Sequence, residues 1–463
     1  MASITISPEL PRNDVILLRN LADDIERCQQ TPGPPPSSNG SAKSSGGIAK
    51  RKPSAPGQEA ANGSSGHYFS PARDDADLGR MRALNDPSSQ DFEPTVFSSV
   101  DLQDLETRLH PVIYRHILLP YIKWAQGIAR HPRQLSDVVM ITHLILYFTT
   151  SVPSAIWLYY HFTYLHGILH FVLQFYYLGT YTLMMHQHIH GGGVLNKKSW
   201  LIHLFDVTFP YITDPLMGHT WNTYYYHHVK HHHVEGNGPD DLSSTIRYQR
   251  DNVWHFLHYV GRFYFLIWFD LPRYFLRKDR PTFGLKAFFW EVSNYVALFT
   301  LFRINARPTF FVFLLPLMLL RAGLMVGNWG QHALVDPDEP DSDYRSSITL
   351  IDVPSNRYCF NDGYHTSHHL NPRRHWREHP VHFLEKKATY SAEHALVFHG
   401  IDYLEITIRV LLKHYDYLAT RLVPIGDRQI AMTLPERAAM LRACTRRFSE
   451  EEIAEKYGRV EAE

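Results

Sequence analysis

The residues best suited to chemistry are histidines gathered in four short clusters. The chain has 30 histidines among 463 residues. A neutral imidazole is a good ligand for iron, zinc, copper or nickel, so the clusters predict a nitrogen-rich metal site. The candidate ligands, which include one asparagine, are His186 and His190; His228, His231, His232 and His233; Asn328 and His332; and His365, His368 and His369.

The spacing within the clusters supports this interpretation. On a helix, positions i, i+3 and i+4 share one face, so HxxxH presents two imidazoles to one point and HxxHH presents three. At this histidine frequency HxxHH should occur about 0.1 times by chance, yet it begins at both His228 and His365. His228, His232 and His233 form an equally good HxxxHH set. The pattern therefore leaves open whether His231 or His233 is a ligand.

The number of candidate histidines predicts two metal ions. The clusters supply two, three, one and three imidazoles, which makes nine, whereas a zinc ion takes about four protein ligands. The three cysteines are far apart in the sequence, which disfavours iron–sulfur and structural zinc chemistry and fits non-haem iron. Asp240 and Asp241 could hydrogen-bond the ligand imidazoles, although solvation at the surface is the simpler interpretation.

Two long apolar blocks predict the elements that position these clusters. From Val138 to Asn196 the chain has no Asp, Glu, Lys or Arg. A bilayer span needs about 20 apolar residues, so each block is long enough for a helical hairpin. The second block divides at Arg303–Pro308, and its charges should face protein or water. The expected spans are Val138–Tyr160, Phe162–Met185, Phe283–Phe302 and Thr309–Asn328.

Two hairpins would place every histidine cluster on one side of the membrane. The segment between them, from Lys197 to Arg280, carries many Lys and Arg, and the positive-inside rule makes that side cytosolic. The termini and the metal site are then cytosolic too. Trp254–Leu271 is aromatic and amphipathic, which suits a helix lying on the membrane surface.

The expected organisation is an all-α membrane protein with a tail at each end. Residues 1–95 should be a disordered tail, because Thr31–Gly66 is rich in Pro, Ser and Gly. Residues 96–137 should form cytosolic or interfacial lead-in helices, 138–426 the membrane catalytic domain, and 427–463 a charged, solvated or interfacial helix beginning near Leu434. Lys and Arg equal Asp and Glu at 46 each, which argues against a nucleic-acid partner.

The order of the clusters resembles the membrane fatty acid desaturase/hydroxylase superfamily, over roughly residues 138–395. His365-Thr-Ser-His368-His369 followed by Leu370-Asn371-Pro372 looks like the last histidine box of that family. Asn328-Trp-Gly-Gln-His332 is similar to an NxxxH element of acyl-CoA desaturases, in which the His binds one iron and the Asn approaches the other through water. The chain departs from the family pattern at His188, between two ligand positions, and in its surplus of histidine in the second cluster.

The resemblance implies a four-helix membrane bundle under a cytosolic helical cap that holds two irons. It also implies O2 as oxidant and electrons from NAD(P)H, delivered through a b-type cytochrome or a ferredoxin. The chain contains no HPGG, the haem-binding signature of fused cytochrome domains, so the donor should be a separate protein. No catalytic residue beyond the metal ligands is expected.

The expected function is the oxygen-dependent introduction of a double bond into the acyl chain of a fatty acid or lipid. A hydroxylase or a terminal-alkene-forming decarboxylase would use the same site. A membrane metal-binding or transport protein is the alternative from another class, but a transporter would carry ionisable residues through its spans, and here most lie at the cytosolic ends. The first 22 residues lack the features of a secretory signal, and the N-terminal region is too acidic for a transit peptide. The resemblance, together with the lack of a transit peptide, implies the endoplasmic reticulum.

Overall fold

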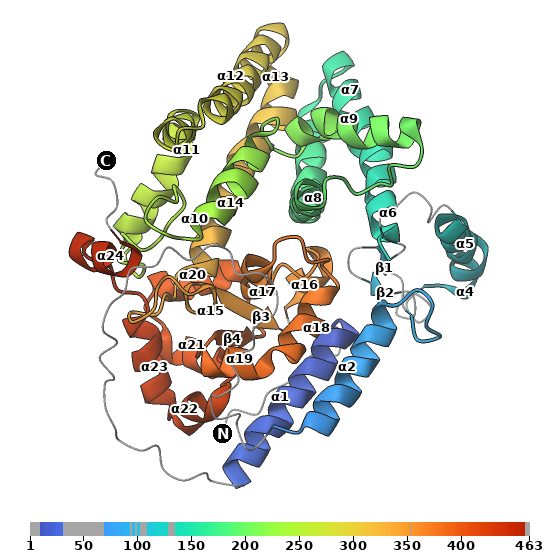
Figure 1. Cartoon of the computed structure of the whole chain (residues 1–463). Helices are drawn as coiled ribbons and strands as arrows, with labels where there is room; N and C mark the ends of the chain where they lie inside the picture. Colours follow the sequence, from blue (N-terminus) through green and yellow to red (C-terminus); the bar gives the residue numbers. More distant parts are fainter. Residues whose placement is uncertain are drawn as a thin grey trace.

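The computed structural model describes residues 10–30, 69–92, 95–97, 100–101, 109–127, 134, 136–351 and 353–458. Over these residues the chain is mostly helical, and its two sheets have two short strands each. Long helices form one half of the molecule, and a cap of shorter helices forms the other half (Figure 1). The all-α expectation is therefore confirmed at this level.

The first expected hairpin is present with nearly the expected bounds. Its first arm runs through α6 (Val138–Leu146), a π-helical segment η2 (Tyr147–Ser151) and α7 (Val152–Tyr160). Its second arm is α8 (Tyr164–Gly191), which begins at the Thr163 side chain that caps it and ends where Gly192 adopts a left-handed conformation. The Ser154 hydroxyl joins the arms, lying 2.8 Å from His166 Nε2 and 2.9 Å from His170 Nδ1.

The second hairpin consists of α12 (Pro281–Ile304) and a rod made of α13 (Ala306–Thr309), η4 (Phe310–Leu314) and α14 (Leu315–Gln331). The chain reverses at Asn305, whose backbone is extended. The expectation that charges in this block face protein holds for Glu291 and Arg321. They form a buried ion pair between α12 and α14, and the Arg321 guanidinium also donates to the Tyr295 hydroxyl.

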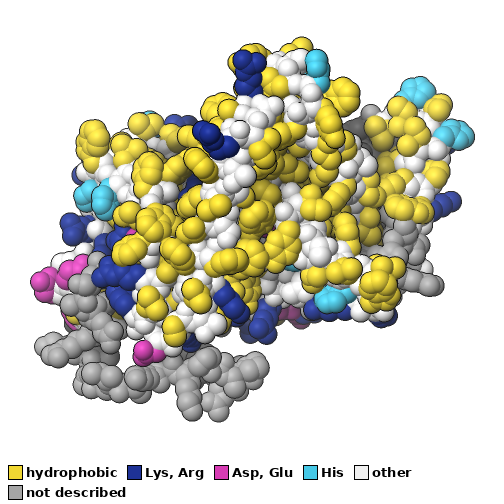
Figure 2. Space-filling model, turned by 90° about the horizontal axis from the view of Figure 1, so that it is seen from above, with side chains coloured by type: hydrophobic (Ala, Val, Ile, Leu, Met, Phe, Trp, Pro, Cys, Tyr) yellow, Lys and Arg dark blue, Asp and Glu magenta, His cyan; other side chains and the backbone are white. Residues whose placement is uncertain are grey.

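Two segments are long and apolar enough to cross a membrane, Val138–Tyr160 and Ala306–Gln331. They correspond to the first and fourth of the expected spans. Helices α8 and α12 have 28 and 24 residues but do not meet the same criterion of hydropathy and charge. Around the far ends of the hairpins, Figure 2 shows a surface covered mostly by hydrophobic side chains, and Trp157, Tyr160 and Phe299 are all more than half exposed. Such a surface is typical of a membrane-embedded face.

Four helical segments connect the two hairpins. They are α9 (Trp200–Leu216), the π-helical η3 (Tyr225–His232), α10 (His233–Glu235) and α11 (Val253–Arg277). Helix α11 contains the expected amphipathic stretch and packs against α12 and α14. Trp254 and Phe265 on its outer face are 77% and 70% exposed. Its position on the membrane surface stays a prediction.

The cap follows α14 and surrounds a small parallel sheet. Strands β3 (Ile348–Ile351) and β4 (Leu396–His399) pair in register from Ile348↔Leu396 to Ile351↔His399, and every residue in both is buried. The cap helices are α15 (Asp343–Ser346), α16 (Pro354–Tyr358), α17 (His365–Leu370), α18 (Glu378–Glu385), α19 (Lys387–Ala392), α20 (Tyr403–Leu411), α21 (Tyr415–Arg421), α22 (Gly426–Ala431), α23 (Leu434–Ala443) and α24 (Glu450–Tyr457).

The expectation of a disordered N-terminal tail is wrong for two segments. Helices α1 (Arg12–Gln30) and α2 (Pro71–Asn85) pack on each other and on the cap. Leu17, Leu18 and Met81 are fully buried there, so these helices have an apolar face that the composition of the tail conceals. Residues 31–68, which include the whole Pro-, Ser- and Gly-rich stretch, lie outside the described residues.

The expectation that the lead-in region is helical is wrong at its start, where β1 (Thr95–Phe97) pairs antiparallel with β2 (Val100–Asp101). The helical segments α4 (Pro111–Ile113), η1 (Tyr114–Leu118) and α5 (Leu119–Gly127) follow. At the other end, the expected helix start at Leu434 is confirmed, and Thr433 and Glu436 form a capping box there. The expectation of a solvated or interfacial helix is wrong for one side of this tail, because Leu441, Phe448 and Ile453 are buried against the cap and the segment before α11.

Candidate metal centre

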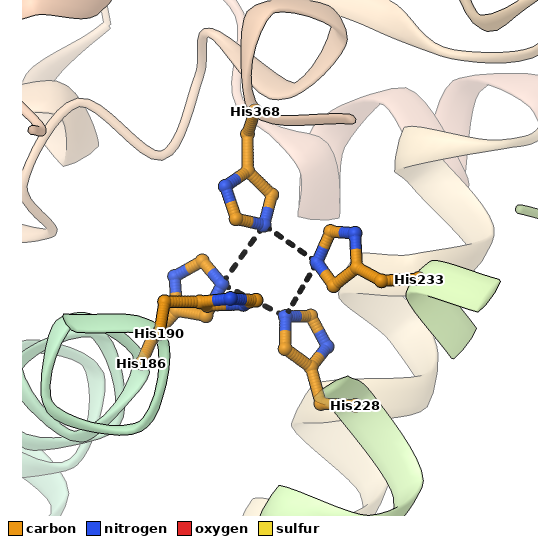
Figure 3. A group of neighbouring side chains, drawn as sticks. All are labelled: His186, His190, His228, His233 and His368. Carbon is orange, nitrogen blue, oxygen red and sulfur yellow. Dashed lines mark hydrogen bonds between the residues drawn. The ribbon is translucent and has the colours of Figure 1, made fainter. Parts of the chain in front are cut away.

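Five histidines from three parts of the chain converge on one point. His186, His190, His228, His233 and His368 each offer a ring nitrogen, and these five atoms lie within 4.8 Å of one another. We call them the five-histidine group. His186 and His190 lie one turn apart on α8, His228 and His233 come from η3 and the start of α10, and His368 comes from α17. Figure 3 shows the rings pointing towards a common centre.

Four nitrogens of this group form a closed quadrilateral (Figure 3). The Nε2–Nε2 distances are 3.0 Å from His186 to His368, 2.8 Å from His368 to His233, 3.1 Å from His233 to His228, and 2.8 Å from His228 to His186. An imidazole nitrogen has a single in-plane site, either an N–H or a lone pair. At most two of the four short Nε2–Nε2 contacts can therefore be hydrogen bonds.

A cation accounts for this close approach better than hydrogen bonding does. It would stabilise lone pairs that otherwise repel each other. An ion at the middle of a square with edges of this length would lie about 2.1 Å from each corner, a usual metal–imidazole distance. His190 Nε2 is buried and has no hydrogen-bond partner among the described residues. The donor set thus fits a metal ion held by imidazoles.

A second group of four histidines lies beside the first. His232, His332, His365 and His369 also bring ring nitrogens within 4.8 Å of one another, and we call them the four-histidine group. His365 Nε2 lies 3.0 Å from His332 Nε2 and 3.1 Å from His369 Nε2. The ring centroids of His233 and His369, one from each group, are 5.2 Å apart. The two groups therefore form one centre with room for two ions.

Two helical segments hold the groups together. Helix α17 sends His365 and His369 into the four-histidine group and His368 into the five-histidine group. The segment from η3 into α10 likewise sends His228 and His233 to one group and His232 to the other. A rotation of either segment would disturb both groups at once.

Backbone and carboxylate partners orient two rings of the four-histidine group. His332 Nδ1 donates to the Ser346 carbonyl at 2.8 Å, and His232 Nδ1 donates to the buried Asp241 carboxylate at 2.7 Å. Each contact places the proton on Nδ1 and leaves the Nε2 lone pair for a metal. The surface role that sequence favoured for Asp241 is thus wrong. Asp240, by contrast, lies near the surface and accepts from the Lys278 ammonium at 2.6 Å.

The local backbone explains why His233 and not His231 joins the five-histidine group. Segment η3 is π-helical, and the His233 N–H bonds the His228 carbonyl, five residues back. This wider turn brings His228 and His233 to one face. His231 points away from both groups, and its Nε2 accepts from the Leu242 N–H at 3.0 Å. Regular helical spacing could not reveal this difference.

Asn328 lies beside the metal centre but in neither group. Its amide nitrogen donates to the Ser243 carbonyl at 2.9 Å and to the Tyr259 hydroxyl at 2.6 Å. It shares the wall of a cavity with His232 and His365. Its sequence neighbour at i+4, His332, belongs to the four-histidine group.

Burial makes His332 and His190 poor bases. It lowers the pKa of His332 to about 4 and that of His190 to about 4, because the charged ring would lose its hydration. The pKa of the Asp241 carboxyl is held well below its usual range, although burial alone would raise it, because His232 and His231 lie beside it. Neutral rings with free lone pairs are the form that binds metals.

Other histidines near the centre have different partners. His379 Nδ1 lies 2.9 Å from the Ser367 hydroxyl on α17, His219 Nε2 lies 3.1 Å from the Thr182 hydroxyl, and His375 Nε2 lies 3.0 Å from Asp137. His188, between the two α8 ligands, lies 3.7 Å from Asp206. None of these rings belongs to the two groups.

A cavity of about 300 Å³ opens from the metal centre into the helical half, and we call it the inner cavity. His186, His228 and His368 of one group and His232 and His365 of the other form its polar end. The remaining wall comes largely from α8 and α14. Leu178, Leu183, Leu320, Leu324 and Met325 are among its apolar residues, and Asn328, Gln331 and Asp362 are polar members of the same wall.

A separate pocket of about 750 Å³ reaches the five-histidine group from another direction, and we call it the polar pocket. His190 and His233 line it, together with Lys230, Arg373 and Arg374. Among the described residues, no carboxylate pairs with Lys230 or Arg373. Asp137, the acidic residue of this pocket, is buried and accepts from the Trp376 indole N–H at 2.9 Å.

These features define a helical protein with candidate membrane helices and a centre for two histidine-bound metal ions. The chain belongs to the fatty acid desaturase family, whose sequence pattern matches residues 157–400. Searches of curated proteins and of solved structures gave no match. The matched residues contain all nine clustered histidines. Family membership implies an oxidoreductase of the di-iron desaturase or hydroxylase type.

Proposed function

We propose that this protein uses O2 to introduce a double bond into the acyl chain of a fatty acid or lipid. The observation that carries the proposal is that residues of both histidine groups line a cavity whose wall also contains several leucines and a methionine. The reaction would convert –CH2–CH2–, O2, two electrons and two protons into –CH=CH– and two molecules of water. It requires an oxidant at the metal centre, an alkyl chain beside it and a supply of electrons.

The nine imidazoles would hold two irons. A nitrogen-rich, thiolate-free ligand set suits non-haem iron, and such irons supply O2 activation and hydrogen removal from an unactivated C–H bond. The residues of this chain orient the ligand rings and set their spacing. Asp241 and Ser346 fix the tautomers of His232 and His332, and α17 and η3 set the spacing of the two groups.

The inner cavity would hold the alkyl chain. The leucines of its wall favour an alkyl chain, and three glycines, Gly179, Gly323 and Gly327, leave room along α8 and α14. A Cβ built on Gly323 or Gly327 would meet no atom within 4 Å outside the backbone of its own helix. These positions therefore border open space that a methylene chain could fill, and the volume is within the range of ligand pockets.

The polar pocket would face the electron donor. Lys230 and Arg373 leave uncompensated positive charge beside His190 and His233. Such charge attracts an acidic partner and speeds its encounter. This supports a separate acidic electron-transfer protein, such as a b-type cytochrome or a ferredoxin reduced by NAD(P)H.

The membrane placement belongs to the same proposal. We infer that α8 and α12 join the two candidate spans in a four-helix bundle, with the cap and the metal centre on the cytosolic side of the endoplasmic reticulum. The exposed apolar side chains of α8 and α12 support this, since Leu165, Leu285 and Ile304 are each more than two-thirds exposed. The alkyl chain would then enter from the bilayer.

Expression in a desaturase-deficient yeast, followed by mass spectrometry of its lipids, tests the proposal. Wild-type protein should produce a new unsaturated acyl chain, and His368→Ala should abolish it. His116→Ala, which changes an exposed histidine on η1, should retain it. Hydroxylated chains or terminal alkenes in place of the new double bond would instead identify a hydroxylase or a decarboxylase. Bound metal with no altered lipid would indicate a metal-binding protein.

A further inference from the structure

The two N-terminal helices lie outside the residues that match the family, yet they are part of the cap core. Helices α1 and α2 lie side by side along the flank of the cap, next to α18 (Figure 1). Leu17, Leu18 and Met81 share a buried cluster with Tyr364 and Phe383. The family match begins only at residue 157. These helices therefore pack against the matched region although they precede it in the sequence.

One polar side chain of α1 reaches the helix that carries the last histidine cluster. Asp14 is fully buried in the first turn of α1. Its carboxylate accepts from the Tyr364 hydroxyl and, at 3.1 Å, from the Asn356 amide. Tyr364 is the N-cap residue of α17, directly before His365.

Asn356, the second partner of Asp14, also hydrogen-bonds to the backbone just before α17. Its amide oxygen accepts from the Gly363 N–H at 2.8 Å, and its amide nitrogen also donates to the Leu350 carbonyl of β3. A Cβ on Gly363 would come within 2.3 Å of that amide oxygen, so the two segments are in close contact. Asp14 thus hydrogen-bonds to Tyr364, the N-cap residue of α17, and to Asn356, which binds the backbone just before it.

The position of the N-terminus of α17 determines where three imidazoles lie. The helix has six residues, and three of them are clustered histidines. His365 and His368 have Nε2 neighbours in their groups at 2.8–3.1 Å. A small displacement of so short a helix would move ligands of both groups out of reach. At its other end, Arg374 donates to the Ser367 carbonyl at 2.8 Å.

We propose that Asp14 is a positioning residue for the metal centre, which fixes α17 through Tyr364 and Asn356 so that His365, His368 and His369 meet their groups. The inference rests on the metal centre of the proposed function. It assigns the N-terminal helices a part in metal retention beyond their contribution to folding.

The matched control is a second buried contact between a tyrosine and an aspartate, neither of which, among the described residues, hydrogen-bonds to either histidine group. The Tyr415 hydroxyl donates to Asp251 at 2.8 Å, and both residues are buried. Tyr364→Phe and Tyr415→Phe each remove one hydroxyl from such a pair and preserve the ring. Asp14→Asn is the third variant, because it keeps an acceptor for Tyr364 but turns an amide towards Asn356.

The experiment uses the full-length protein in detergent, loaded with ferrous iron and then exposed to a coloured ferrous chelator. Tyr364→Phe and Asp14→Asn should release iron about tenfold faster than wild type, because changes behind metal ligands typically weaken metal affinity by at least about that factor. Tyr415→Phe should release iron at the wild-type rate even if its melting temperature falls as much. Equal release rates for Tyr364→Phe and Tyr415→Phe would overturn the inference.

The outcome is separable from that of the proposed function. Faster release by the Asp14 and Tyr364 variants supports the inference even if the yeast lipids do not change. New unsaturated lipids together with unchanged release rates would overturn the inference and leave the proposed function standing. A wild-type protein that binds no iron would overturn both.

Discussion

His232 Nδ1 lies 2.7 Å from a carboxylate oxygen of Asp241, and this contact joins a candidate metal ligand to a buried charge. The carboxylate is itself held by the Asn237 N–H at 3.1 Å and by the Ser243 N–H at 2.8 Å. Its orientation is therefore set before any metal binds. Such an arrangement fixes the tautomer of the ring and raises the basicity of the nitrogen that faces the metal.

Asp241→Asn should weaken metal binding at the four-histidine group by about 10–100-fold. The amide loses the negative charge that favours a proton on His232 Nδ1. Competition with a chelator of known affinity measures the change. Asp343→Asn is the control, because its carboxylate lies 3.9 Å from His369 Nδ1, beyond hydrogen-bond distance, and is partly exposed. Equal losses in both variants would contradict the assignment.

Filling the inner cavity should stop turnover without removing the metals. Gly323→Leu adds a side chain where a Cβ meets open space in the cavity wall. We expect unsaturated product to fall at least about tenfold, since a misplaced substrate can cost two orders of magnitude in rate, while iron content stays unchanged.

Gly261→Leu is the matched control for the cavity. Gly261 lies on α11, does not line the inner cavity, and a Cβ there also meets no atom within 4 Å outside its own helix backbone. Full activity in Gly323→Leu, measured by lipid analysis in yeast, would mean that the acyl chain binds elsewhere.

Reversing charge at the polar pocket should slow electron delivery. Lys230→Glu combined with Arg373→Glu should lower the rate at which an acidic, reduced b-type cytochrome domain is oxidised by about tenfold at low salt, and less at high salt. Arg80→Glu on α2, where the side chain is 72% exposed, tests a charge reversal elsewhere. Reduction by dithionite should be equal in all variants. If Arg80→Glu lowered the rate of cytochrome oxidation as much as the Lys230→Glu and Arg373→Glu changes do, the result would argue against docking at this pocket.

The metal-free protein should lose stability as the pH falls from about 6.5 towards 4. An imidazole in the unfolded chain binds a proton near pH 6.5, whereas burial lowers the pKa of His332 and His190 to about 4. Between these values the unfolded state binds more protons, so acid favours unfolding. Urea titrations of chelator-treated protein at a series of pH values would show this. A free energy of unfolding that is constant across the range would be inconsistent with buried, neutral rings.

Features that depend on local periodicity could be predicted from sequence. The first span, Val138–Tyr160, follows from an uncharged run of sufficient length, and the HxxxH pair on α8 follows from helical geometry. The family match agrees with the resemblance drawn from the order of the histidine clusters. These inferences needed no knowledge of how distant segments pack.

Features that depend on tertiary packing could not be predicted. The π-helical turn of η3, which places His233 and not His231 in the five-histidine group, follows from no regular helical spacing. The division of α17 between two groups depends on where α8 and α14 end. Asp241 appeared to be a surface residue because its burial is produced by the fold around it. Helix α1 did carry a signal, in the spacing of Leu17, Leu18 and Leu21, which the composition of the following stretch concealed.

The central claim is that nine imidazoles, with His233 among them and His231 excluded, hold two irons. Iron analysis of the purified full-length chain and of two neighbouring alanine variants tests it most directly. Wild-type protein and His231→Ala should each retain two irons per chain, whereas His233→Ala should lose iron from the five-histidine group. A wild-type chain with fewer than two irons, or a His231→Ala variant as depleted as His233→Ala, would contradict the account.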